Sequence, residues 1–86
     1  MKKLITDVEN EGLIKLMGQR VLLMCANYFY AGKLIGVNDR FCLLEDPSIV
    51  YDTGDWTKKE YETEQKMNVK EHYVMIHMIE SFGVAK

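Results

Sequence analysis

Three glutamates at alternate positions come closest to a catalytic or metal-binding spacing. In an extended segment, Glu60, Glu62 and Glu64 would present their carboxylates on one face. The residues around them are polar and charged, which favours a face turned to solvent over a reactive site. The sequence has no nucleophile elbow, no phosphate-binding loop and no carboxylate pair with a histidine at useful spacing. We therefore expect a protein that is not an enzyme.

The two cysteines indicate a reducing compartment. Cys25 and Cys42 lie inside apolar runs, and no pair of Cys or His residues has the spacing of metal ligands. We expect no disulfide, no metal and no cofactor. The longest apolar run, residues 21–26, is far shorter than a membrane span, and the first residues lack the apolar core of a secretion signal. The sequence thus predicts a cytoplasmic protein without a membrane partner.

The charge of the chain limits what it can bind. The sequence contains 11 Lys and Arg against 13 Asp and Glu, a formal net charge of −2. Affinity for a phosphate backbone depends on clustered cations. Composition therefore counts against a strongly basic nucleic-acid binder, and any such function requires a local patch on an acidic surface.

One turn offers such a patch. Asn38 and Asp39 form a pair typical of tight turns, and Arg40 and Phe41 follow directly. A cation beside an aromatic ring can contact phosphate and stack on a base. His77, in an apolar segment near the end of the sequence, is a further candidate for ligand contact. The plainer roles of these residues are a hairpin turn, a core phenylalanine and a hydrogen-bonded histidine.

A small, mostly β fold must position these residues. Apolar residues at helical spacing predict a helix over residues 4–17. Short apolar segments separated by turns predict about five strands in a single domain, over residues 19–52 and 72–85. Residues 53–71 are charged and polar, and we call them the charged excursion. Their pattern leaves a short helix and a two-stranded arm open.

Three local features of the strands follow from the sequence. Residues 21–26 are almost wholly apolar, which predicts a strand buried on both faces. Gly32 and Gly36 share one face of the next strand. This spacing predicts a strong bend or close packing over that face. Residues 73–79 read as one continuous strand, with a short last strand at residues 81–84.

Residues 13–84, interrupted by an insertion at residues 55–71, resemble the Sm-like family, which includes eukaryotic Sm and LSm proteins and bacterial Hfq. The likeness to its first motif lies in residues 18–21, 32–41 and 43–46, which read Gly-Gln-Arg-Val, Gly-Lys-Leu-Ile-Gly-Val-Asn-Asp-Arg-Phe and Leu-Leu-Glu-Asp. The second motif is matched loosely by residues 74–78. The resemblance implies a small, strongly bent, five-stranded Sm-like (SH3-like) barrel with an N-terminal helix.

The resemblance also implies a homo-oligomeric ring of about five to seven subunits, in which the last two strands of neighbouring copies pair edge to edge. A ring removes every exposed strand edge, since each edge finds a partner. It also increases the buried area of a domain with a thin core. We therefore expect the main partner of this chain to be itself.

In the Sm-like family, U- or A-rich single-stranded RNA binds near the pore, one base per subunit. Matched position by position, Asn38 takes the usual acidic position with Asp39 beside it, and Phe41 takes the stacking position. Arg40 supplies a cation, and His77 stands where the family has an arginine. The resemblance therefore implies that these five residues bind RNA.

Departures from the family pattern favour a different class of function, as does the acidic pI of about 5.6. Cys42 stands where the family has a base-reading asparagine, and His77 where it has an arginine, while Met78 replaces a glycine. The alternative is a ring-forming protein-assembly or scaffold module without nucleic-acid activity. In either case, the charged excursion is a candidate surface for a protein partner or a neighbouring subunit.

Overall fold

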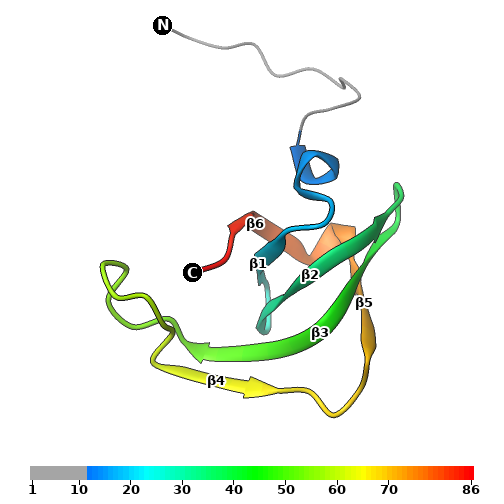
Figure 1. Cartoon of the computed structure of the whole chain (residues 1–86). Helices are drawn as coiled ribbons and strands as arrows, with labels where there is room; N and C mark the ends of the chain where they lie inside the picture. The colour runs from blue at the N-terminus through cyan, green and yellow to red at the C-terminus, as the bar shows by residue number, and fades with distance from the viewer. Residues whose placement is uncertain (1–11) are drawn as a thin grey trace, which may run out of the picture.

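The computed structural model describes residues 12–86, and their architecture is mostly β (Figure 1). The strands are β1 (Arg20–Cys25), β2 (Phe29–Val37), β3 (Phe41–Asp52), β4 (Thr63–Lys66), β5 (Glu71–Met75) and β6 (Ile79–Val84). Two short 3-10 helices, η1 (Gly12–Leu16) and η2 (Ile76–Met78), precede β1 and separate β5 from β6. The predicted mostly-β class is confirmed.

All six strands belong to one antiparallel sheet. Its order is β4-β3-β2-β1-β6, and β5 pairs with the first half of β3 while β4 pairs with the second half. β5 and β6 are not paired with each other, so the described sheet is not closed by hydrogen bonds. The predicted closed five-stranded barrel is therefore not confirmed.

The predicted helix over residues 4–17 is also not confirmed. Its residues 4–11 lie outside the described part of the chain, and Gly12–Leu16 form the 3-10 helix η1. Gly18 then adopts a positive φ of 85°, a backbone conformation that glycine tolerates. The Gly18 amide donates to the Leu34 carbonyl at 2.7 Å, which turns the chain into β1.

Residues 73–79 do not form the single strand predicted from their apolar character, since η2 interrupts them. The Ile76 amide donates to the Arg40 carbonyl at 2.9 Å, and the Met78 carbonyl accepts from the Ala26 amide at 3.1 Å. These bonds hold η2 between the β2–β3 turn and the end of β1. The chain changes direction there, so that β5 stays with β3 and β6 reaches β1.

Apolar side chains pack on both faces of β1, as predicted. Val21 and Leu23 are fully buried in one cluster with Leu34 and Leu44. Leu22 belongs to a second cluster, which includes Ala31, Val50 and Tyr61. Burial of each large aliphatic side chain contributes about 1.5–3 kcal/mol, so these two clusters dominate the stability of the sheet.

Gly32 allows β2 and β3 to approach closely, as its position in the sequence predicts. A Cβ atom at this position would lie 3.0 Å from the Leu44 Cβ and 3.2 Å from the Glu45 carbonyl oxygen. The pairing of β2 with β3 shifts register at Gly32, between Ala31 and Lys33, and again between Leu34 and Gly36. Such shifts increase the local twist and bend of a strand, and β3 curves strongly along its length (Figure 1).

The charged excursion contains β4 and no helix, so it folds as an arm laid along β3. Ser48, Glu64 and Arg20 fasten it. Arg20 Nη2 lies 2.5 Å from Glu64 Oε2 and donates to Ser48 Oγ at 3.2 Å, and the Ser48 hydroxyl donates to the same Glu64 carboxylate. Ser48 and Glu64, which follow Arg20 by 28 and 44 positions, thus both contact the Arg20 side chain.

Candidate functional site

The β2–β3 turn takes its shape from Asn38. The Asn38 side-chain oxygen accepts hydrogen bonds from the amides of Arg40 and Phe41, each at 2.8 Å. The Asn38 amide donates to the Phe41 carbonyl at 3.0 Å, which closes the turn. Asparagine favours such turns because its short side chain replaces a backbone acceptor. The side-chain oxygen of Asn38 is therefore engaged in ordering the loop.

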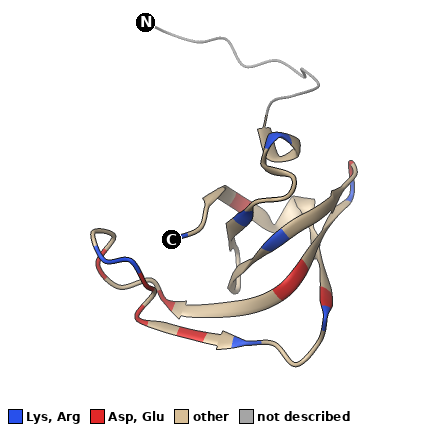
Figure 2. Cartoon of the chain, viewed as in Figure 1, with Lys and Arg blue, Asp and Glu red and all other residues tan. Residues whose placement is uncertain are grey.

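Asp39 and Arg40 lie exposed at the tip of this turn, where Figure 2 shows one acidic and one basic segment side by side. The Arg40 carbonyl is held by the Ile76 amide, so the backbone beneath its side chain is fixed. A guanidinium at an exposed tip keeps its five donors available for phosphate or for the face of a base.

Phe41 is half-buried and lies against Tyr73 of β5. Their ring centroids are 5.1 Å apart with an angle of 59° between the planes. Tyr73 itself is 61% exposed. An open pocket of about 520 Å³ is lined by Asn38, Arg40, Phe41, Tyr73 and Met75. It thus combines two aromatic rings, a flexible thioether and a cation, which suits a flat, anionic ligand.

His77 lies on η2 and is exposed, not in a strand as predicted. Its neighbour Ile76 is bonded to the Arg40 carbonyl, so η2 and the β2–β3 turn are adjacent. The structure therefore brings the two predicted binding segments together. It does not place the His77 side chain in the lining of the Phe41 pocket.

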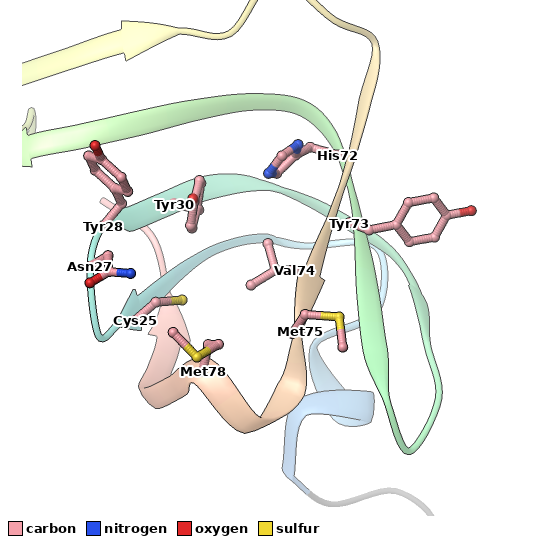
Figure 3. Close-up of a pocket in the computed structure, with 9 residues that line it drawn as sticks. All are labelled: Cys25, Asn27, Tyr28, Tyr30, His72, Tyr73, Val74, Met75 and Met78. Atoms are coloured by element: carbon pink, nitrogen blue, oxygen red, sulfur yellow. The ribbon is translucent and has the colours of Figure 1, made fainter.

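A second pocket, of about 270 Å³, lies between the end of β1, the start of β2 and β5 (Figure 3). His72 and Tyr30 meet in it with ring centroids 5.4 Å apart. Tyr28 stands at its rim, edge-on to Tyr30 at 6.4 Å. Tyr73 points away from the other side chains of this pocket, on the opposite side of β5 from His72 (Figure 3). Tyr73 and Met75 nevertheless contribute to the lining of both pockets, which adjoin at β5.

The side chains that the sequence did not single out are Tyr73, Met75 and His72. All three lie on β5, whose alternation could have revealed them. A strand of five residues puts positions 73 and 75 on one side and position 72 on the other. The sequence prediction named His77 instead, the residue that stands where the Sm-like pattern has an arginine.

The two thiols are unsuited to nucleophilic chemistry. Burial raises the pKa of the Cys42 thiol from 9.0 to about 11, with a smaller contribution from nearby Cys25. Burial raises the pKa of Cys25 as well. Because the thiolate is the reactive species, both groups stay protonated and inert near neutral pH. Cys42, which is buried in the core cluster, therefore offers packing instead of a polar contact.

Within residues 12–86, no three His, Cys, Asp or Glu side chains gather into a cluster able to hold a metal ion. Glu60 is not a β4 residue, so the three glutamates noted in the sequence do not share one strand. In the same part of the chain, no helix has the length and apolar character needed to cross a membrane.

Comparisons with known proteins leave the structure as the main guide to function: no family model, curated protein or solved structure matches this chain.

Proposed function

We propose that this protein is an Sm-like, ring-forming protein that binds U- or A-rich single-stranded RNA near its pore. The observation that carries the proposal is the pocket of the β2–β3 turn, where Phe41 and Tyr73 lie beside Arg40. Stacking of one base on an aromatic side chain contributes about 1–3 kcal/mol. Repetition around a ring raises such a modest affinity to useful avidity.

The order of the elements supports the Sm-like assignment. A short helix precedes a bent antiparallel sheet, the last strand returns to β1, and a short turn, η2, separates it from the strand before. In the family, the turn after strand two and the turn after strand four form the RNA slot. Their counterparts here are residues 38–40 and η2, and the bond from Ile76 to Arg40 joins them.

Two of the unpaired strand edges support the ring. Within residues 12–86, β5 pairs only with β3, and β6 pairs only with β1. Each free edge belongs to a strand with exposed apolar side chains at alternate positions: Tyr73 and Met75 on β5, Phe82 and Val84 on β6. An unprotected edge of this kind is a template for pairing. Pairing β5 of one copy with β6 of the next gives a head-to-tail contact, the type of interface from which rings are built when the rotation between copies closes.

The roles of the five site residues follow from their positions. Asn38 holds the loop, and Asp39 shapes its exposed tip. Phe41 stacks on the base, while Arg40 meets a phosphate or the base from the rim of the pocket. His77 contacts the RNA from η2, on the adjacent turn.

Fluorescence anisotropy with labelled U-rich and A-rich RNA, and matching DNA, at two salt concentrations tests this function. We expect saturable binding that prefers RNA and weakens with salt. Phe41→Ala should weaken binding about tenfold, within the ~1–3 kcal/mol of one stacked base. Arg40→Ala should lower the dependence of log K on log salt by about 1 for each phosphate that an Arg40 side chain neutralises.

Lys58→Ala is the matched control, because Lys58 is an exposed cation of the charged excursion. The excursion leaves β3 at the end opposite the β2–β3 turn (Figure 1). The mass of each variant, measured by native mass spectrometry, should equal that of the parent ring. A double variant, Phe41→Ala with Arg40→Ala, that binds as well as the parent would show that the slot is misplaced. A ring that binds no RNA at tens of micromolar subunit would favour the assembly or scaffold module instead.

A further inference from the structure

The charged excursion folds around the ammonium group of Lys86. Lys86 Nζ donates to three backbone carbonyl oxygens: Thr53 at 2.7 Å, Asp55 at 2.8 Å and Glu60 at 3.2 Å. A lysine ammonium has three N–H donors and no acceptor. The number of acceptors therefore equals the number of donors, and each proton has a partner.

Two aromatic rings complete the surroundings of this ammonium. Lys86 Nζ lies 5.2 Å from the ring centroid of Trp56 and 5.0 Å from that of Tyr61. Both distances fall within the range of cation–π attraction. We call Thr53, Asp55, Trp56, Glu60 and Tyr61 the ammonium cage.

Tyr61 connects the ammonium cage to the sheet. Its side chain is 9% exposed and packs in the cluster of Leu22, Ala31 and Val50. Its hydroxyl accepts a hydrogen bond from the Lys86 amide at 3.1 Å. One wall of the cage is thus rigid. Trp56, by contrast, is 59% exposed and lies on the outer wall.

The chemistry of the ammonium cage is selective. The three carbonyl oxygens favour a cation that donates three hydrogen bonds. A quaternary ammonium has no N–H group and cannot donate any. The aromatic faces attract any cation, but they do not replace the missing hydrogen bonds. The Asp55 carboxylate adds to the preference of the cage for a cation. It accepts hydrogen bonds from the Thr57 amide and hydroxyl, which lower the pKa of Asp55. The nearby Lys86 ammonium lowers this pKa to a smaller extent.

We propose that residues 53–61 form a binding site for a primary alkylammonium, and that Lys86 is its built-in ligand. Seating of Lys86 sets the conformation of the outer half of the charged excursion. Without it, three carbonyls and the Trp56 ring lose their common partner, while Tyr61 keeps its place in the core. This inference is independent of RNA binding and of the ring.

Removal of the ligand and its replacement from solution test the site. Lys86→Ala should accelerate hydrogen exchange of residues 53–60 about tenfold, since this half of the excursion contains few other contacts. The fluorescence of Trp56, the single tryptophan of the chain, should change with it. n-Propylammonium, which supplies the atoms that the variant lacks, should restore both signals. Tetramethylammonium at equal ionic strength should restore neither.

Lys58→Ala serves as the matched control, because Lys58 is an exposed lysine of the same segment. It should leave exchange and fluorescence unchanged. Lys86→Met, which keeps most of the apolar stem without the ammonium, should behave like Lys86→Ala. Unchanged exchange in both Lys86 variants would overturn the proposal, and so would equal rescue by the two cations.

A measurement on the unaltered protein covers the case in which the Lys86 variants do not fold. Limited acylation of the lysines, read by mass spectrometry, should modify Lys58 and Lys59 several-fold faster than Lys86. The seated ammonium must leave three hydrogen bonds before it can react. Equal rates at Lys86 and Lys58 would overturn the proposal.

Discussion

The β body, comprising β1, β2, β3, β5 and β6, and the charged excursion are stabilised by different contacts. The β body buries apolar side chains on both faces of β1, and four of its leucines and valines are completely inaccessible. In the excursion, all of which the structure describes, Tyr61 is the only buried residue. The rest of the excursion depends on the pairing of β4 with β3 and on polar contacts to Arg20, Ser48 and Lys86. Both signs of charge alternate along it in Figure 2.

The difference shows how one short chain supports two levels of stability. Apolar burial is cooperative, so a defect in the β body affects the whole sheet. Partly exposed polar contacts are weaker and local, so a defect in the excursion changes that segment alone. The following substitutions test this difference in stability between the β body and the excursion, beginning with the largest expected effect.

Leu44→Ala should cost about 2–5 kcal/mol of unfolding free energy, because it opens a cavity beside Leu23 and Leu34. Urea denaturation followed by circular dichroism measures the loss. Val69→Ala, at a 51% exposed site of the excursion, is the counterpart and should change stability by less than about 0.5 kcal/mol. Equal losses at the two sites would refute the contrast.

Gly32→Ala should cost about 1–3 kcal/mol, since the new methyl would meet the Leu44 Cβ and the Glu45 carbonyl across the β2–β3 ladder. Gly83→Ala is the control within the same sheet, as no atom of the described chain beyond its two sequence neighbours lies within 4 Å of a Cβ at that position. Thermal melts of both variants give the comparison. If the Gly83 variant were as unstable as the Gly32 variant, the loss would come from the backbone freedom of glycine and not from the close approach of β2 and β3.

Alkaline pH should destabilise the β body through Cys42. Its pKa rises from 9.0 to about 11 on folding, so between these values the folded state holds a proton that the unfolded state releases. The contribution of Cys42 is present below pH 9 and declines by about 1.4 kcal/mol for each pH unit up to 11. Cys42→Ala should show a shallower loss of stability between pH 9 and 11. Parallel curves would contradict the assignment.

Glu64→Gln should have the smallest effect, about 0.2–1 kcal/mol, because the Arg20 and Glu64 side chains remain 42% and 29% exposed. Hydrogen exchange should rise in β4 and stay unchanged in β1 and β2. Glu62→Gln, at a neighbouring exposed glutamate, should leave β4 exchange as it is. A loss of stability throughout the sheet would place Glu64 within the cooperative unit instead.

The sequence predicts the β body far better than the excursion, for a physical reason. Strands such as β1 are recognised in the sequence by a run of apolar residues. The Asn38 turn is recognised by residue types that favour turns. β4 has four exposed polar residues, and its place depends on an ion pair to Arg20, 44 positions away. Contacts between distant residues leave no local pattern in the chain.

The candidate site was predicted in part. The turn of Asn38, Asp39, Arg40 and Phe41 forms as expected, but η2 replaces the strand that was predicted to contain His77. Residues 76–78 are apolar enough for either structure, and the bond from Ile76 to the Arg40 carbonyl decides between them. The ammonium cage was beyond prediction, because its acceptors are backbone carbonyls, which every residue possesses.

The pairing of β1 with β6 has a consequence for how the protein reaches its native state. Val21 pairs with Val84, residues roughly sixty positions apart, and such distant ladders form late because the intervening chain must first be ordered. During synthesis, β1, β2 and β3 can pair as soon as they leave the ribosome. The outer edge of β1 remains unpaired until β6 has been synthesised. Until then, the most apolar strand of the chain is half-covered, and crowding of nascent chains at that moment favours aggregation.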